Sequence, residues 1–356
     1  MADIQKQFVQ FDESIRLKRF EENQMLIEKR DAILDRLRAQ FAKRRKEGET
    51  IPSFQHLNQG SYQMGTGIQP AQGDYDIDVG LCFNCSTRDY PNPVSLKVLV
   101  ADALAEHTDL GTRIRRSCVT VYYKLGGEQA YHVDLAVYAY DNPQSRMPQL
   151  FLAKGYRDAD AKSRSWESSD PKGLCAWVEG RFPDNDQELQ FLRVIRALKR
   201  WKTEKFKLDG DNAPSGIGLT VAAGKWFSPR VTRDPFTQKT TFNDLEAMRH
   251  FVQALVGQFY SVGTKGDGNL LYRLQVPVPV PPGKDIFERM SPGQMTVFRE
   301  RLTQLQDLLT RVARETDPVD ACKLMRKEFC DEFPVPDRND TGRSGPKAIS
   351  TSGISA

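Results

Sequence analysis

Two aspartates lie two residues apart in the segment Asp76-Ile77-Asp78-Val79-Gly80. Side chains along a β-strand alternate between its two faces, so an extended chain puts both carboxylates on one face and the apolar side chains on the other. Carboxylates this close repel one another unless a cation lies between them. Two hard oxygen ligands in phase suit Mg²⁺, which commonly shares its coordination shell with substrate phosphates. The segment therefore predicts a strand that presents a divalent metal site.

A third carboxylate, Asp134, occurs in a segment of the same kind. Residues 130–138 alternate, with apolar side chains on one face and Asp134 on the other. This segment follows a β-rich run at 118–124 and the pair Gly126-Gly127, a pattern that is typical of a β-hairpin. We therefore expect Asp134 on a strand that can lie beside the one carrying the first two aspartates.

A glycine and a serine precede the aspartates where the chain is predicted to turn. Residues 53–58 read as a short strand, and Gly60-Ser61 then leads into a short helix. Glycine lets the backbone approach a ligand closely, and the amides at a helix start point toward an anion. The Ser61 hydroxyl can add a hydrogen bond to a terminal phosphate. A phosphate-binding turn and three carboxylates together predict a two-metal phosphoryl-transfer site.

A lone Asp-x-Asp pair commonly belongs to a solvated turn or strand end, so the pair alone is weak support. Here the opposed apolar face and the third carboxylate, in order along the chain, favour the metal site. Asp158 and Asp160 form a second such pair, but in a polar stretch without an apolar opposite face. We expect that second pair on the surface.

The motifs resemble those of the polymerase-β-type nucleotidyltransferase superfamily. More narrowly, Gln59-Gly60-Ser61, residues 76–80 and His132-Val133-Asp134 are similar to the bacterial cGAS/DncV-like nucleotidyltransferases of anti-phage CBASS systems. Three downstream blocks match in the same order: Trp166-x-x-Ser169-Asp170-Pro171-Lys172, Leu198-Lys199-x-Trp201 and Pro214-Ser215-Gly216-Ile217. The resemblance covers roughly residues 10–335.

The resemblance implies a role for particular residues. Asp76, Asp78 and Asp134 would hold two Mg²⁺ ions, for which Mn²⁺ can substitute, and Asp134 would also orient or deprotonate the attacking hydroxyl. The residues that would bind nucleotide are Gln59, Gly60, Ser61, Ser169, Asp170, Lys199 and Ser215. Lys199 would act as a point charge on the triphosphate. From the residues alone, Lys199 is equally an ordinary helix-surface lysine, and Ser169-Asp170 and Ser215 are equally ordinary helix caps.

The activity that the resemblance implies is synthesis of a cyclic oligonucleotide messenger from ATP and/or GTP, with release of pyrophosphate. A cyclic GMP-AMP-like dinucleotide is the expected product. The alternative is a linear nucleotidyltransferase acting on an RNA end or a protein acceptor, which would need the same carboxylates and an open acceptor groove. A non-enzymatic nucleotide sensor is a third class, against which the three intact carboxylates argue. The bases joined, the ring size, the linkage and the activating signal stay open.

The amino-acid composition indicates the class of protein and the compartment in which it works. Apolar residues make up 39% and charged residues 28% of the 356 residues, which is typical of a globular protein. No apolar run reaches membrane-spanning length, and the first residues have no signal-peptide character, so we expect a cytoplasmic protein. Six cysteines without regular spacing fit reduced thiols in that compartment. Cys82-x-x-Cys85 lacks a second Cys/His pair at ligand spacing, which disfavours zinc.

The net charge of +4 is mild, although basic residues cluster at 43–46 and again at Arg113, Arg115 and Arg116. Long nucleic acids generally require a broader basic face. The charge pattern therefore disfavours activation by duplex DNA, whereas a nucleotide pocket would also need local positive charge.

The expected fold is α+β, with a catalytic lobe and a helical lobe on either side of a cleft. Residues 1–52 are predicted to form one or two long helices which, as in the family, brace both lobes. Residues 53–165 would form the nucleotidyltransferase lobe, a mixed sheet flanked by helices. Within that lobe, residues 142–165 are expected to form a polar loop near the mouth of the cleft.

Residues 166–335 are predicted to form the helical lobe. Its expected helices span about 186–206, 214–227, 241–260, 292–314 and 318–331. Residues 336–356 have the composition of a flexible tail. In some family members an E1/E2-like partner conjugates this tail to a target, which suggests a conjugation partner here as well.

Overall fold

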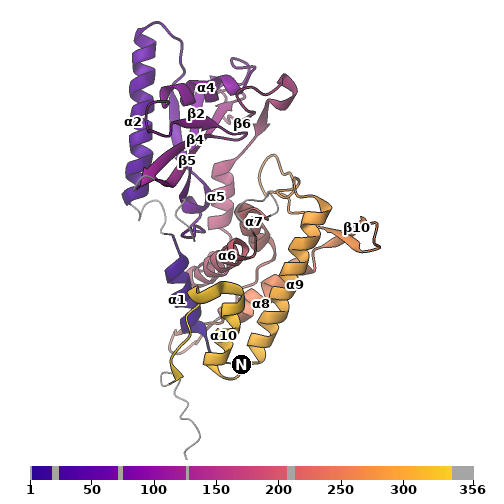
Figure 1. Cartoon of the computed structure of the whole chain (residues 1–356). Coiled ribbons are helices and arrows are strands. Elements are labelled where there is room, and N and C mark those ends of the chain that lie inside the picture. Colours follow the sequence, from indigo (N-terminus) through magenta and orange to yellow (C-terminus); the bar gives the residue numbers. More distant parts are fainter. Residues whose placement is uncertain (1, 18–23, 71–74, 126–127, 207–212, 339–356) are drawn as a thin grey trace, which may run out of the picture.

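The computed structural model describes residues 2–17, 24–70, 75–125, 128–206 and 213–338 (Figure 1). For residues 25, 26, 75, 76, 125 and 128–130 it describes the backbone alone. A lobe built on a β-sheet and a lobe built of helices lie one above the other, with helix α5 (Pro171–Glu179) between them (Figure 1).

The sheet has seven strands and is mixed. Its central order is β1-β2-β5-β4-β3, and β6 and β7 extend it beside β5. The strands are β1 (Phe54–Asn58), β2 (Tyr75–Ser86), β3 (Thr112–Ile114), β4 (Val119–Leu125), β5 (Glu128–Tyr140), β6 (Leu150–Lys154) and β7 (Ser165–Ser168). Among the pairings between these strands, β2 with β5 is parallel and the others are antiparallel. The β4–β5 pairing confirms the expected hairpin.

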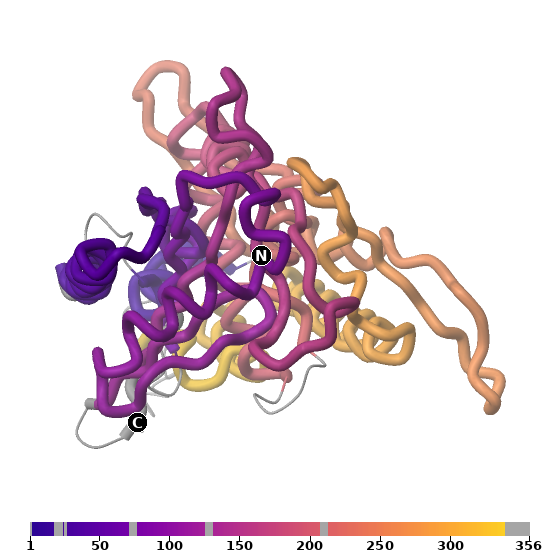
Figure 2. Tube along the Cα trace, turned by 90° about the horizontal axis from the view of Figure 1, so that it is seen from above, coloured from indigo at the N-terminus to yellow at the C-terminus, as the bar shows by residue number. Residues whose placement is uncertain are grey.

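Two helices cover the apolar face of the sheet. They are α2 (Gln24–Lys46) and α4 (Val94–Ala103), and Figure 2 shows α2 alongside the sheet. The core beneath them contains alternate residues of β2 and β5, among them Ile77, Val79, Val133 and Leu135. Burying an aliphatic or aromatic side chain stabilises a fold by roughly 1.5–3 kcal/mol, so this alternation fixes which face of each strand is covered. The opposite face carries the polar residues and a small apolar cluster of Leu57, Cys82, Ala136 and Tyr138.

The second lobe is arranged around α6 (Asn185–Lys205), which is buried along most of its length. Its neighbours in the helical core are α1 (Gln5–Ile15), α7 (Gly216–Trp226), α8 (Asp244–Val256), α9 (Pro292–Arg314) and α10 (Pro318–Phe329). Two small hairpins complete it, β8 (Val231–Arg233) with β9 (Thr240–Phe242) and β10 (Tyr260–Thr264) with β11 (Leu270–Arg273). Short helical turns are α3 (Gly60–Gln63), η2 (Ala161–Ser163) and η3 (Cys330–Glu332).

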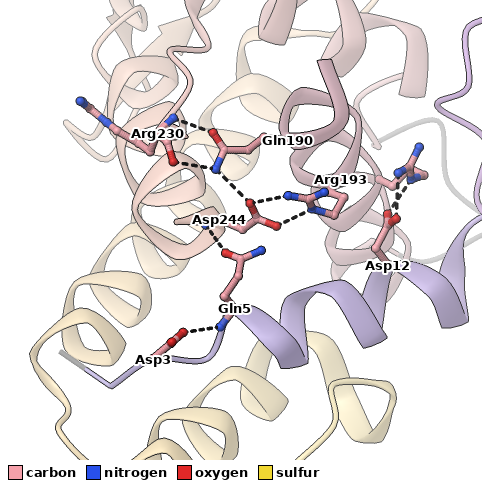
Figure 3. Close-up of polar contacts among 8 residues, drawn as sticks. Asp3, Gln5, Asp12, Gln190, Arg193, Arg230 and Asp244 are labelled. Carbon is pink, nitrogen blue, oxygen red and sulfur yellow. Dashed lines mark hydrogen bonds and ion pairs between the residues drawn. The ribbon is translucent and has the colours of Figure 1, made fainter. Parts of the chain in front are cut away.

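The two N-terminal helices belong to different lobes. α2 packs on the sheet, whereas α1 packs on α6 and α8. Buried polar contacts fix α1 in place: Gln5 accepts a hydrogen bond from the Asp244 amide at 2.9 Å, and Asp244 in turn accepts from Arg193 and Gln190 (Figure 3). A carboxylate at a helix start that is fully hydrogen-bonded in this way is not an unpaired buried charge.

A second contact joins α1 to the other lobe. Arg196 of α6 donates to both carboxylate oxygens of Asp12, at 2.6 and 2.8 Å, and also to the carbonyl of Gly65 at 2.6 Å. Gly65 follows α3 in the sheet lobe, so this buried guanidinium connects α1, α6 and the turn after β1. Such bidentate Arg–carboxylate pairs are geometrically specific.

The expected loop at 142–165 is wrong in part. Residues 150–154 form β6, and a further strand, β7, starts at residue 165. Leu150 and Leu152 pack beside Tyr138 on the polar face of the sheet, and Ala153 is buried in the main sheet core. Long-range pairing with β5 therefore determined this strand, although the surrounding residues are polar and rich in turn formers. Asp158 and Asp160 are exposed, as expected.

None of the described helices is long and apolar enough to cross a membrane.

Candidate active site

Two of the three expected carboxylates are direct neighbours in the sheet. Asp78 of β2 is paired with Asp134 of β5 across the parallel register, and both side chains are half-buried. Paired residues on adjacent strands have side chains on the same face. Asp76 lies two residues earlier on β2 and is paired with His132, but its side chain lies outside the described residues.

The glycine of the predicted phosphate turn lies directly over Asp78. Gly60 begins α3 with a φ of +74°, a conformation that L side chains rarely adopt. A Cβ at this position would lie 2.8 Å from both Cβ and Cγ of Asp78 and closer still to its carboxylate oxygen. Glycine is therefore required at position 60 for two reasons: the positive φ angle, and the space that the Asp78 carboxylate occupies. Ser61 follows within α3 and is half-buried.

Asp134 is held by a residue of the neighbouring strand. The hydroxyl of Thr120, which pairs with Asp134 across β4 and β5, donates to Asp134 Oδ1 at 2.5 Å. Thr120 itself is fully buried. A short hydrogen bond to a carboxylate fixes its orientation.

A buried tyrosine positions the residue before Gly60. The hydroxyl of Tyr138 donates to Gln59 Oε1 at 3.0 Å. Burial raises the pKa of Tyr138 above its usual range, and nearby Cys82 and Asp78 add to that effect, whereas hydrogen bonds with Gln59 and Ser169 lower it. Tyr138 therefore stays protonated and links the turn to the start of the second lobe.

Lys199 reaches the site from α6 and is buried. Its ammonium group donates to the carbonyl and the hydroxyl of Thr66, at 3.0 and 2.9 Å. The pKa of Lys199 is lowered to about 7, chiefly because the group is buried; the charges of Lys202 and Arg196 lower it as well, and Asp78 acts in the opposite direction. Arrival of an anion would therefore favour the protonated lysine.

Two further predicted nucleotide-binding residues, Ser215 and Asp170, are helix caps. Ser215 is exposed and its oxygen accepts from the Gly218 amide at the start of α7, at 3.1 Å. Asp170 accepts from the Gly173 amide at the start of α5, at 2.7 Å. Both side chains therefore act as helix caps, which was the alternative to nucleotide binding in the sequence analysis. A serine hydroxyl that accepts one hydrogen bond can still donate another.

One cavity brings most of these residues together between the two lobes. It has a volume of about 940 Å³, within the range of small-molecule sites. Of the predicted site residues, it is lined by Gln59, Gly60, Ser61, Asp78, Ser169, Asp170 and Lys199. Asp134 and Ser215 do not line it. α6 contributes a positive wall of Lys199, Arg200 and Lys202 to the same cavity.

The donor set fits a hard divalent ion such as Mg²⁺ or Mn²⁺. Asp78 and Asp134 supply carboxylate oxygens on neighbouring strands, beside a cavity with a positive wall for phosphates. No group of three His, Cys, Asp or Glu side chains gathers at metal-binding distance within the described part of the chain. The third expected ligand, Asp76, is on the correct strand, and its side chain lies outside that part.

The arrangement of the two lobes defines the fold of this protein. It is the fold of a polymerase-β-type nucleotidyltransferase lobe, with a helical lobe on the other side of the cavity.

Comparison with known proteins narrows this class of fold. Residues 54–138 match the family model described as the nucleotidyltransferase domain of DncV-like cyclic GMP-AMP synthases. The matched segment runs from β1 into β5 and includes Gly60, Asp78 and Asp134. A cyclic GMP-AMP synthase from Escherichia albertii is 21% identical over 180 residues, which cover 49% of this chain and 38% of that protein.

Solved structures have the same fold over nearly the whole chain. The Vibrio cholerae DncV cyclic AMP-GMP synthase is similar with a TM-score of 0.67 at 19% identity, covering 94% of this chain and 98% of that one. The same Vibrio cholerae enzyme in complex with the linear intermediate 5′ pppA(3′,5′)pG gives a TM-score of 0.66 at 17% identity, covering 92% and 96%. The mixed sheet with a helical lobe is therefore confirmed as the fold.

Three residues at the site have no signal in the sequence motifs. Thr120 and Tyr138 contact predicted site residues through side-chain hydrogen bonds, and Thr66 receives both bonds from Lys199. The alternation of β5 places Tyr138 on the acidic face, four residues after Asp134, but it gives no sign of the hydrogen bond to Gln59. Thr66 could not have been found, because it is 133 residues from its partner.

Proposed function

We propose that this protein joins nucleoside triphosphates, ATP and/or GTP, by nucleotidyl transfer and closes the product into a cyclic dinucleotide. The observation that carries the proposal is the pairing of Asp78 with Asp134 directly beneath Gly60, next to a cavity with a positive wall. The relatives named above are described as cyclic GMP-AMP and cyclic AMP-GMP synthases, and a DncV structure contains a linear intermediate.

We assign the metal-binding role to Asp76, Asp78 and Asp134, with two Mg²⁺ ions or Mn²⁺ in their place. When bound, the ions would offset the charge of the triphosphate and favour ionisation of the attacking hydroxyl. The chain's own contribution is geometric: Thr120 orients Asp134, and Gly60 leaves the space in which Asp78 lies.

The triphosphate of the donor nucleotide is assigned to the cavity. The amides of Gly60 and Ser61 and the Ser61 hydroxyl bind its oxygens. The Lys199 ammonium adds a charge there. Ser215 precedes Gly216, which lines the cavity, and its hydroxyl would donate from the start of α7. Gln59, Ser169 and Asp170 form the cavity wall on the side of the nucleoside.

The reaction forms a bond between the acceptor hydroxyl oxygen and the α-phosphorus of the donor. The bond from that phosphorus to the bridging oxygen of pyrophosphate breaks, and pyrophosphate leaves with the electron pair. Asp134 accepts the hydroxyl proton and passes it to solvent. A second transfer within the linear product closes the ring, and a cyclic GMP-AMP-like messenger for anti-phage defence is the product we propose.

A product assay separates this function from its alternatives. Purified protein is incubated with labelled ATP and GTP and Mg²⁺ or Mn²⁺, then with phosphatase. A phosphatase-resistant small product supports the cyclase. Label found only on added RNA or on protein would instead support the linear nucleotidyltransferase, and absence of any turnover would support a nucleotide sensor.

The setting we propose is the cytoplasm, where the nucleotide substrates are present. The six cysteines are free thiols in the described structure, as expected in a reducing compartment. We also propose the lobe boundaries given above. The mild net charge of +4 disfavours activation by duplex DNA. The proposed E1/E2-like conjugation involves the tail, residues 336–356, most of which lies outside the described residues. Intact-mass analysis of protein co-expressed with its operon neighbours tests this conjugation, against which a solely unmodified mass would count.

A further inference from the structure

The polar face of the sheet continues beyond Asp134, away from the cavity. His132 lies two residues before Asp134 on β5, and Tyr122 is its partner on β4. Since Thr120 is likewise the partner of Asp134, alternation puts all four side chains on one face. Both Tyr122 and His132 are half-buried, so they form part of the surface beside the carboxylates.

An arginine from the β3–β4 connection, Arg115, lies beside the Tyr122 ring. Arg115 is exposed and donates to the Tyr122 hydroxyl at 2.8 Å, with its guanidinium carbon 5.9 Å from the centre of the Tyr122 ring. The Tyr122 and His132 rings lie with centroids 6.1 Å apart and planes inclined by 40°. Two aromatic faces and one cation thus lie next to Asp134. We call these three residues the aromatic platform.

The charged group of the platform, Arg115, interacts electrostatically with the Asp134 carboxylate. The hydrogen bond to Tyr122 raises the pKa of Arg115, and the charge of Asp134 contributes in the same direction. No residue of the platform lines the 940 Å³ cavity, which lies on the side of Asp78, Lys199 and α6. The two sets of residues therefore flank the carboxylate pair from different sides.

Nucleotidyl transfer between two nucleotides requires a second nucleotide whose hydroxyl lies beside Asp134. That nucleotide carries a planar base and an anionic triphosphate. Aromatic side chains stack on any base, and a guanidinium matches phosphate oxygens with several donors at once. The platform presents both kinds of group at the required place.

We propose that Tyr122, His132 and Arg115 bind the acceptor nucleoside triphosphate, with the base against the rings and a phosphate on the guanidinium. This inference rests on the proposed function, because it assigns the second substrate of that reaction. It also concerns a nucleotide acceptor and not an RNA end or a protein. The Tyr122 hydroxyl orients the arginine and does not itself contact the reacting atoms.

The test counts nucleotides bound per chain. Equilibrium titrations use α,β-methylene ATP and α,β-methylene GTP together with Mg²⁺, so that no transfer occurs. Wild-type protein binds two nucleotides per chain. Arg115→Ala and Tyr122→Ala retain the first with unchanged affinity and bind the second at least about tenfold more weakly, since stacking contributes substantially for each base. Tyr122→Phe, which keeps the ring and frees the arginine, has a smaller effect.

Arg311→Ala is the matched control, because Arg311 is exposed on α9 in the other lobe and its loss removes the same charge. It should bind two nucleotides as wild type does, and all variants should keep the wild-type melting temperature within a few degrees. Two nucleotides bound with near wild-type affinity by both alanine variants would overturn the platform while leaving the proposed function intact. Absence of nucleotide binding by wild-type protein would overturn both.

Discussion

Gly60→Ala separates the role of the turn at the site from its role in the fold. The added Cβ would lie 2.8 Å from Asp78 Cβ and Cγ, whereas carbon atoms pack best at about 3.5–4.0 Å. The Asp78 carboxylate must therefore move by about 1 Å, or the turn must move away from it. A displacement of about 1 Å at reacting groups can lower a rate about 100-fold. We expect a fall in kcat of that order.

The same substitution also has a cost for folding. An alanine forced into the positive-φ region destabilises a protein by roughly 1–2 kcal/mol. Gly48→Ala is the matched control, because Gly48 has a φ of +96° and no atom lies within 4 Å of the position of its Cβ. That variant shares the backbone strain without the clash, so it should lose similar stability and keep its activity.

The assay is the initial rate of pyrophosphate release from ATP and GTP, with thermal unfolding of each variant measured in parallel. Gly60→Ala should lose activity at temperatures where Gly48→Ala, equally destabilised, does not. Equal activities of the two variants, or a Gly60→Ala rate within about threefold of wild type, would refute the steric argument, since an order-of-magnitude effect is expected.

Three further perturbations test individual residues. Thr120→Val removes the hydrogen bond to Asp134, so it should lower kcat roughly tenfold and the unfolding free energy by about 1 kcal/mol. Thr120→Ser keeps the hydroxyl and should have wild-type values of both. An unchanged kcat in the valine variant would contradict the positioning role of Thr120. Lys199 has a pKa of about 7, and a bound triphosphate raises this pKa. Nucleotide affinity should therefore be highest below pH 7, where the lysine is already protonated, and should fall by up to about tenfold per pH unit above pH 7. Lys199→Arg, which stays charged, should flatten that profile in the same titration, and an equally steep profile would contradict the assignment. Asp76→Asn with Asp78→Asn should abolish product formation and leave the melting curve cooperative; full residual activity would rule out the metal site.

The sequence predicted the strands that carry the carboxylates because their patterns are local. Alternating apolar and polar residues over β2 and β5 determine both the conformation and the buried face. Predicted helix boundaries agree with the structure for the same reason. For example, α9 spans Pro292–Arg314, as expected from its apolar spacing and its proline at the first turn.

The position of Thr120 could not be predicted in this way. β4 ends at Leu125 and β5 begins at Glu128, and a regular hairpin extended from those ends would pair Asp134 with Val119. The register shifts by one residue between Tyr123 and Lys124, and this irregularity brings Thr120 opposite Asp134. A shift of one residue exchanges the two faces of a strand, so the hydrogen bond that holds Asp134 depends on a bulge that no local pattern encodes.

Local sequence patterns could not predict the contacts between the lobes either. Lys199 was expected at the site from its motif, but its attachment to Thr66, and the lowered pKa that follows from its burial, depend on the packing of α6 against the turn after β1. Likewise, β6 forms because β5 offers an edge to pair with. In both cases the determining partner lies on a separate element.

The proposed function depends on Asp76, Asp78 and Asp134 binding divalent ions beside a nucleotide triphosphate. Anomalous diffraction from crystals grown with Mn²⁺ and α,β-methylene ATP tests this binding most directly. We expect anomalous peaks within about 2.3 Å of carboxylate oxygens of both Asp78 and Asp134, with the triphosphate reaching toward Lys199. Manganese bound elsewhere, or nucleotide bound with no metal between these two carboxylates, would contradict it.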